Sequence, residues 1–125
     1  MQQKTDLHSM VHAYLQCFEA RDLSQCMDFF AEDANLIFYM GSYRGREDIE
    51  QWHRDRFAAD FRVIRIDKIE VQGDTVTVNA VATSNRLNAW RLGSLSGTAT
   101  FSFNGGKIKD VKFGLRKAIP IEDWH

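Results

Sequence analysis

The chain of 125 residues, 44% of them hydrophobic, has the length of one domain and enough apolar side chains for a single core. Its 16 lysines and arginines nearly balance 17 aspartates and glutamates, and the net charge of -1 argues against nucleic acid or an anionic membrane as the main partner. No stretch approaches the ~18 apolar residues of a membrane span, and two cysteines without CxxC spacing or a secretory signal indicate reduced thiols. We therefore expect one cytoplasmic domain over residues 1–125, with its core from 5 to 115 and a tail from 116 to 125.

Helical periodicity is confined to the first half of the chain. Apolar residues from Thr5 to Arg21 recur at intervals of three and four, which predicts one long amphipathic helix. A short second helix is predicted within residues 21–30. A third is predicted from Arg46 to Asp60, with Trp52 and His53 on its inward side.

Strands are indicated by apolar runs and by period-two alternation. One apolar run, residues 32–40, precedes the third helix and is followed by a turn at residues 41–45. Four longer segments then alternate almost to the end of the chain: residues 61–72, 75–87, 89–103 and 107–115. Asn104 and Gly105 between the last two predict a tight hairpin, because both residues accept a positive φ. Helices followed by an antiparallel meander predict an α+β fold, in which the helices pack against one curled sheet.

Several short motifs point to a known family. They are Tyr14 with Phe18 ahead of the Arg-Asp pair at 21–22, FAEDA at 30–34, RGRE at 44–47 and GKI at 106–108. Over residues 5 to 115 the chain resembles the nuclear transport factor 2-like superfamily, especially its SnoaL-like branch of polyketide cyclases and ketosteroid isomerase relatives. The resemblance implies a cone-shaped, curved antiparallel sheet wrapped around the long N-terminal helix, with three helices followed by a four-strand meander. It also implies an apolar pocket and commonly a homodimer, but the superfamily holds both enzymes and carriers, so it assigns no activity.

The isomerase relatives imply three polar groups, and this chain matches one of them. Their tyrosine corresponds to Tyr14, whereas their carboxylate base falls on Phe38 and their second hydrogen-bond donor on Ala99. Isomerisation by that mechanism is therefore not expected. His53 is the remaining proton-transfer candidate, because imidazole titrates near neutral pH. Two interpretations stay open. In one, His53 is hydrogen-bonded within the core or lies at the rim of the pocket. In the other, His53 as base and Tyr14 as donor act on a hydroxyl or carbonyl substrate.

Strand alternation and helix periodicity together predict a strongly aromatic and nearly uncharged interior. Small residues in two strands leave room there for a cavity that suits a flat or hydrophobic ligand. The residues predicted to line this pocket are Phe18, Phe30, Phe38, Trp52, Phe57, Ser84, Leu95, Gly97, Ala99, Val111 and Phe113. The outer face of the sheet is rich in threonine and is the predicted homodimer contact. His8 and His12 have a spacing that can hold zinc, but no third ligand accompanies them, so neither a metal nor another cofactor is expected.

Three functions from different classes are compatible with these residues. The missing carboxylates favour a SnoaL-like protein that binds a small hydrophobic or aromatic molecule. The alternative is a cofactor-free lyase, isomerase or cyclase that uses His53 and Tyr14 in an apolar pocket. A third is a dimeric association module. An open cavity shared by His53 and Tyr14 would favour the enzyme.

Overall fold

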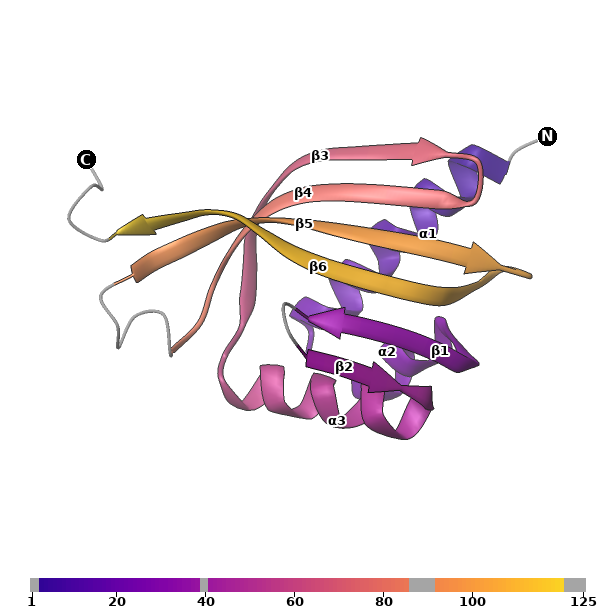
Figure 1. Cartoon of the computed structure of the whole chain (residues 1–125), viewed down its shortest axis with the longest axis horizontal. Coiled ribbons are helices and arrows are strands. Elements are labelled where there is room, and N and C mark those ends of the chain that lie inside the picture. The colour runs from indigo at the N-terminus through magenta and orange to yellow at the C-terminus, as the bar shows by residue number, and fades with distance from the viewer. Residues whose placement is uncertain (1–2, 39–40, 86–91, 121–125) are drawn as a thin grey trace.

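The computed structural model describes residues 3–38, 41–85 and 92–120, and Figure 1 shows their arrangement. The three helices are α1 (Gln3–Glu19), α2 (Leu23–Asp28) and α3 (Gly45–Ala58). Their number and order confirm the prediction. α2 begins where Asp22 caps it, because the Asp22 carboxylate accepts a hydrogen bond from the Gln25 backbone N–H at 3.1 Å.

The strands form one six-stranded sheet in the order β2-β1-β6-β5-β4-β3. Their bounds are β1 (Phe30–Phe38), β2 (Gly41–Arg44), β3 (Arg62–Gln72), β4 (Thr75–Thr83), β5 (Leu92–Asn104) and β6 (Lys107–Pro120). The last four strands are the predicted antiparallel meander. The curved sheet lies against α1, which crosses behind it in Figure 1, so the α+β cone fold is confirmed.

Three details of the sheet differ from the prediction. β1 pairs with β6 in parallel, so the sheet is not antiparallel throughout. β2 occupies most of the predicted turn, because it pairs with β1 at the edge of the sheet. β6 continues to Pro120, where a tail from residue 116 was predicted, since its far end pairs with the start of β5. Residues 121–125 of that tail, and residues 86–91 between β4 and β5, lie outside the described residues.

Aromatic side chains dominate the core between α1, α3 and the inner face of the sheet. α1 buries one stripe that includes Val11, Tyr14 and Phe18, and α3 buries Trp52 and His53. Burying an apolar side chain of this size stabilises a fold by about 1.5–3 kcal/mol, so this stripe fixes α1 on the sheet. Among the described residues, no helix is both long and apolar enough to cross a membrane.

Candidate functional site

An apolar cavity of about 80 Å³ lies between α1 and the inner face of the sheet. Small side chains on two neighbouring strands create it. Ala80 of β4 pairs with Gly97 of β5, and Ala99 pairs with Val78 one step further along the same ladder. Because alanine and glycine end at or before Cβ, the sheet leaves unfilled space at these positions.

The structure brings five of the predicted pocket residues to this cavity. They are Phe38, Leu95, Gly97, Ala99 and Phe113. Among the described residues that line the cavity, none is ionisable. These side chains offer a ligand mainly dispersion contacts.

The other predicted pocket residues do not line the cavity. Phe18, Phe30, Trp52 and Val111 are buried in the core. Phe57 packs against that core, and Ser84 is buried elsewhere. Phe18, Phe30 and Phe57 pack around His53 instead, and Trp52 stacks on Phe113.

Other described residues at the cavity were absent from the predicted set: Leu15, Phe61, Val63, Val78, Ala80, Ala82, Thr98 and Gly114. Leu15 belongs to α1, and Phe61 and Val63 lie just before and within the start of β3. For Phe61 and Val63, the period-two alternation of this strand segment indicated that both side chains point to the same face of the sheet. The helical spacing of Leu15 placed it on the apolar stripe, and only the position of α1 over the sheet shows that it reaches the cavity.

An aromatic wall formed by Phe38, Phe113 and Trp52 adjoins the cavity. The Trp52 ring stacks on Phe113, with centroids 5.2 Å apart and an interplanar angle of 15°. It also makes an edge contact with Phe38 at 5.5 Å. Phe38 and Phe113 line the cavity, Trp52 packs against both without lining it, and the centroid of the His53 ring lies 4.9 Å from that of Trp52.

Tyr14 and His53 form a hydrogen-bonded pair inside this core. The Tyr14 hydroxyl lies 2.7 Å from His53 Nε2, and His53 Nδ1 lies 2.8 Å from the carbonyl oxygen of Ile49. A carbonyl only accepts, so Nδ1 carries the proton and Nε2 accepts from the Tyr14 O–H. Both side chains are at most 2% exposed. The pair satisfies its own polar atoms without a ligand.

Burial fixes the protonation state of both partners. It lowers the pKa of His53 from 6.5 to about 4, and the Ile49 carbonyl and the Glu50 charge offset this only in part. Burial also raises the pKa of Tyr14 well above its ordinary value. Near neutral pH both groups are uncharged, and neither lines the cavity. The structure thus joins the two predicted catalytic residues to each other without placing them at the cavity.

One polar atom of the wall lacks a partner. Among the described side chains, the buried Trp52 Nε1–H has no hydrogen-bond acceptor. An unpaired buried donor costs about 1–3 kcal/mol, which the packing of the indole ring has to offset.

Within the described part of the chain, no three His, Cys, Asp or Glu side chains gather as metal ligands.

Known structures share this fold at low sequence identity. Bal32a, from a soil-derived mobile gene cassette, superposes with a TM-score of 0.80 at 17% identity, covering 91% of this chain and 92% of that one. A proposed polyketide cyclase from Sinorhizobium meliloti gives a TM-score of 0.76 at 20% identity, over 89% and 98% of the chains. A proposed ketosteroid isomerase from Kribbella flavida gives 0.78 at 14% identity, over 91% and 80%. Likeness at these identities shows the fold alone.

Sequence comparison identifies the family. No curated protein matches this chain significantly. The SnoaL-like domain pattern matches residues 11–111, from the middle of α1 into β6, which is most of the chain. With the cone fold described above, this match confirms the resemblance seen in the short motifs, and the chain belongs to the SnoaL-like domain family.

Proposed function

We propose that this protein binds a small hydrophobic or aromatic molecule in the cavity between α1 and the sheet. The observation that carries the proposal is the lining, which is largely apolar and has no ionisable side chain among the described residues. Apolar surface transferred from water to such a site contributes about 25 cal/mol per Å². Phe38 and Phe113 offer ring surfaces at one wall, which favours a flat ligand.

The size of the cavity sets a condition on the ligand. A cavity of about 150 Å³ holds one benzene molecule. The cavity here, at about 80 Å³, is roughly half as large. A ring-sized ligand therefore has to displace a side chain of the lining, and half-buried side chains such as Leu15 and Phe61 have the most freedom to move.

Ligand-induced thermal stabilisation tests the proposal. A panel of aromatic and polycyclic compounds should give saturable increases in the melting temperature, because the ligands bind only the folded chain. Ala99→Leu fills the cavity and should abolish these increases. Ala58→Leu makes the same change at an exposed position at the end of α3 and should preserve them. A flat response across the panel would contradict binding and favour the association module.

The enzyme alternative has one supporting observation, the 2.7 Å hydrogen bond between Tyr14 and His53. A lyase, isomerase or cyclase would need the pair to reach a substrate, and neither Tyr14 nor His53 lines the cavity. The catalytic roles of His53 and Tyr14 stay predictions. Turnover of a cyclisation or dehydration substrate that Tyr14→Phe abolishes would establish them.

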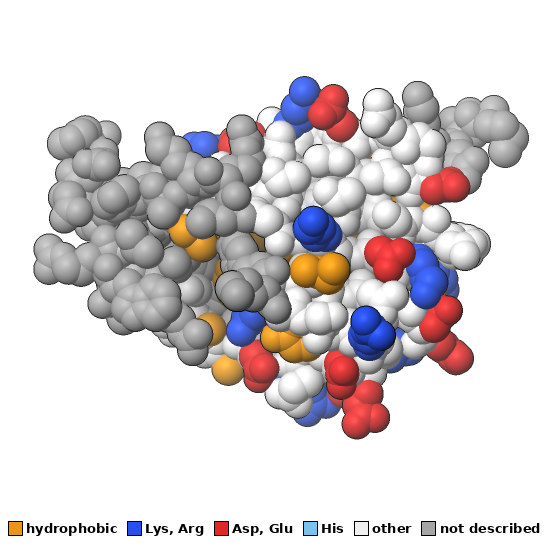
Figure 2. Space-filling view, viewed as in Figure 1, with side chains coloured by type: hydrophobic (Ala, Val, Ile, Leu, Met, Phe, Trp, Pro, Cys, Tyr) orange, Lys and Arg blue, Asp and Glu red, His pale blue; other side chains and the backbone are white. Residues whose placement is uncertain are grey.

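We also propose a homodimer formed through the outer face of the sheet. Outward side chains of β4 and β5, such as Thr77, Asn79 and Thr100, are uncharged and half-buried. Figure 2 shows broad uncharged areas over this face. Light scattering should give a dimer mass for the wild type and a monomer mass for Thr77→Arg with Thr100→Arg. The control, Ser9→Arg with Ser24→Arg on exposed helix positions, should stay dimeric, and a monomeric wild type would refute the proposal.

A cytoplasmic location is the remaining part of the proposal. It is supported by two free thiols, the half-buried Cys17 and the buried Cys26. Reducing compartments keep such thiols free, whereas oxidising compartments favour disulfides. Fractionation of cells that produce the protein would test the location, and recovery from an oxidising compartment would contradict it.

A further inference from the structure

A second hollow adjoins the cavity on its helix side. It is an open groove of about 470 Å³ between α1 and β3, the strand at the edge of the sheet. α1 contributes His12, Gln16 and Glu19 to it, at the spacing of one helix face. The groove is therefore lined by ionisable and amide side chains as well as apolar ones, whereas the described lining of the cavity has no ionisable or amide side chain.

Two side chains separate the groove from the cavity. Leu15 of α1 and Val63 of β3 line both hollows. Each is half-buried. Because the same two side chains form a wall of each hollow, movement of either one connects the polar groove with the apolar cavity.

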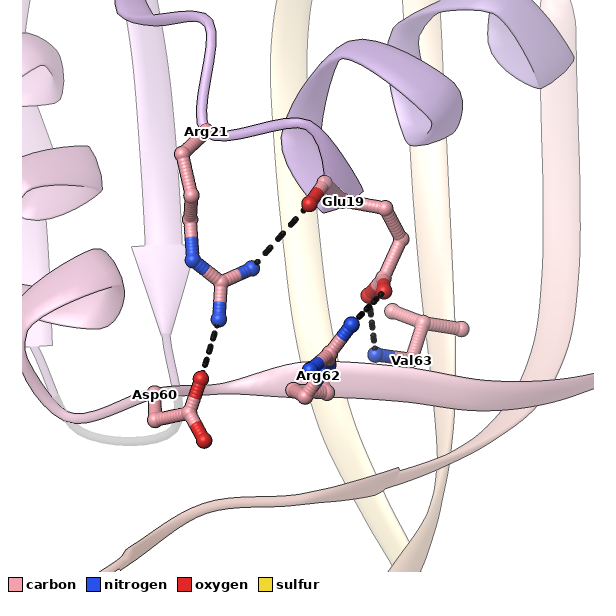
Figure 3. A network of polar contacts seen from close by, with 5 residues as sticks. All are labelled: Glu19, Arg21, Asp60, Arg62 and Val63. Carbon is pink, nitrogen blue, oxygen red and sulfur yellow. Dashed lines mark hydrogen bonds and ion pairs between the residues drawn. The ribbon is translucent and has the colours of Figure 1, made fainter.

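Polar contacts at the end of α1 hold one side of this partition, as Figure 3 shows. The Glu19 carboxylate accepts a hydrogen bond from the Val63 backbone N–H at 2.7 Å and lies 3.5 Å from the Arg62 guanidinium. Arg21 donates to the Asp60 carboxylate at 2.5 Å and to the Glu19 carbonyl oxygen at 3.4 Å. These contacts tie the start of β3 to α1. The Val63 backbone is thereby fixed, and the Leu15 side chain is the part of the partition that can change rotamer.

The same contacts determine which ligand head the groove favours. Glu19 faces Arg62, and Asp60 faces Arg21, so each carboxylate is matched by a guanidinium. No unmatched charge among these four groups would attract an ion of either sign. His12 and Gln16 are exposed, and their imidazole and amide groups can donate and accept hydrogen bonds. A neutral hydroxyl or amide group suits this lining.

We propose that the ligand is a neutral amphipathic molecule that occupies both hollows. This inference rests on the binding function proposed above. The apolar part fills the cavity and displaces Leu15, because the cavity alone is too small for a ring. The hydroxyl or amide head lies in the groove, where His12 and Gln16 bind it.

Two probes with the same apolar part separate the roles of the hollows. 3-Phenylpropan-1-ol carries a hydroxyl head, and propylbenzene carries none. Dissociation constants would be measured by calorimetry on the full chain. Gln16→Met keeps the length of the side chain and removes its amide, and should weaken the alcohol about 3- to 10-fold, the value of one net hydrogen bond. It should leave propylbenzene unchanged.

Matched controls come from other positions of the chain. Gln51→Met makes the same change at an exposed position of α3 outside the groove, and should leave both dissociation constants unchanged. His12→Ala should weaken the alcohol alone. His8→Ala, one turn earlier on α1 and outside the groove, should not. The charged analogues 3-phenylpropylammonium and 3-phenylpropanoate should both bind more weakly than the alcohol.

The outcomes distinguish this inference from the proposed function. If propylbenzene binds and Ala99→Leu abolishes its binding, the cavity is the binding site. If, in that case, Gln16→Met and His12→Ala leave the alcohol unaffected, the inference about the groove is wrong and the binding function stands. If neither probe binds the wild-type chain, the inference about the groove is wrong, and the thermal-shift panel described above decides the binding function separately.

Discussion

Protonation of His53 should make the stability of this protein depend on pH in a defined window. In the fold His53 is 0% exposed, donates from Nδ1 to the Ile49 carbonyl and accepts at Nε2 from Tyr14. A second proton would have to enter at Nε2, where the Tyr14 hydroxyl already donates. Burial therefore lowers the pKa of His53 to about 4 from 6.5 in an unfolded chain.

The sign of the effect follows from proton binding. Between those two pKa values the unfolded chain binds one more proton than the folded chain, so the free energy of unfolding falls as the pH falls. The contribution is fully present above 6.5 and is lost progressively as the pH decreases toward about 4. At about 1.4 kcal/mol per pKa unit, the total loss is roughly 3–4 kcal/mol.

Urea denaturation at several pH values measures this loss. The slope between about pH 6.5 and pH 5 should approach 1.4 kcal/mol per pH unit in the wild type, because most carboxylates titrate below that range. Tyr14→Phe with His53→Leu removes both polar partners together. In this double variant the slope should be smaller by up to about 1.4 kcal/mol per pH unit, which corresponds to one proton. His8→Ala, which removes an exposed histidine, should keep it. Equal slopes in the wild type and the double variant would refute the assignment of a buried neutral imidazole.

Three further predictions concern packing, thiol reactivity and backbone conformation. Trp52→Phe should reduce the free energy of unfolding by less than about 2 kcal/mol, because it keeps an aromatic ring and removes an N–H without an acceptor among the described side chains. A larger loss in urea denaturation would contradict this prediction. At about pH 8, Ellman's reagent should modify the half-buried Cys17 well before Cys26, since burial raises the pKa of the Cys26 thiol to about 12. Equal rates in the folded protein would contradict this. Gly45→Ala should destabilise the fold by about 1–2 kcal/mol, because Gly45 has a left-handed φ of 83° that alanine disfavours. No atom within 4 Å would clash with the added Cβ, so the backbone conformation alone accounts for the expected loss. Gly114→Ala has equal space without a left-handed φ, and should be nearly neutral in the same denaturation experiment.

Binding and catalysis require different things of the same core. Catalysis by a histidine and a tyrosine needs both groups within reach of a substrate. Here the Tyr14 hydroxyl is occupied by His53, and the nearest side chains around the imidazole include the rings of Phe18, Phe30 and Trp52. This arrangement stabilises a polar pair inside the core and leaves the cavity to apolar contacts.

The sequence predicted the elements whose periodicity is regular. The helical spacing of Val11, Tyr14 and Phe18 required one buried face, and the alternation in β4 and β5 required the small residues to point inward. Both expectations depend on local geometry alone, because side chains recur every 3.6 residues in a helix and every two in a strand. β2 was missed because its sequence lacks such a periodic pattern. Its four residues carry turn-like sequence, and it is a strand because Tyr43 pairs with Leu36 of β1.

The candidate site depended on contacts that no local pattern contains. Phe38 and Trp52 both belong to the predicted aromatic interior, yet Phe38 lines the cavity and Trp52 does not. His53 was a candidate from its place on α3, but its partner Tyr14 lies 39 residues away in the chain. The sequence by itself determined which residues turn inward. Only the tertiary structure decided which of them surround empty space and which saturate one another, because that depends on how α1 and α3 are placed over the curved sheet.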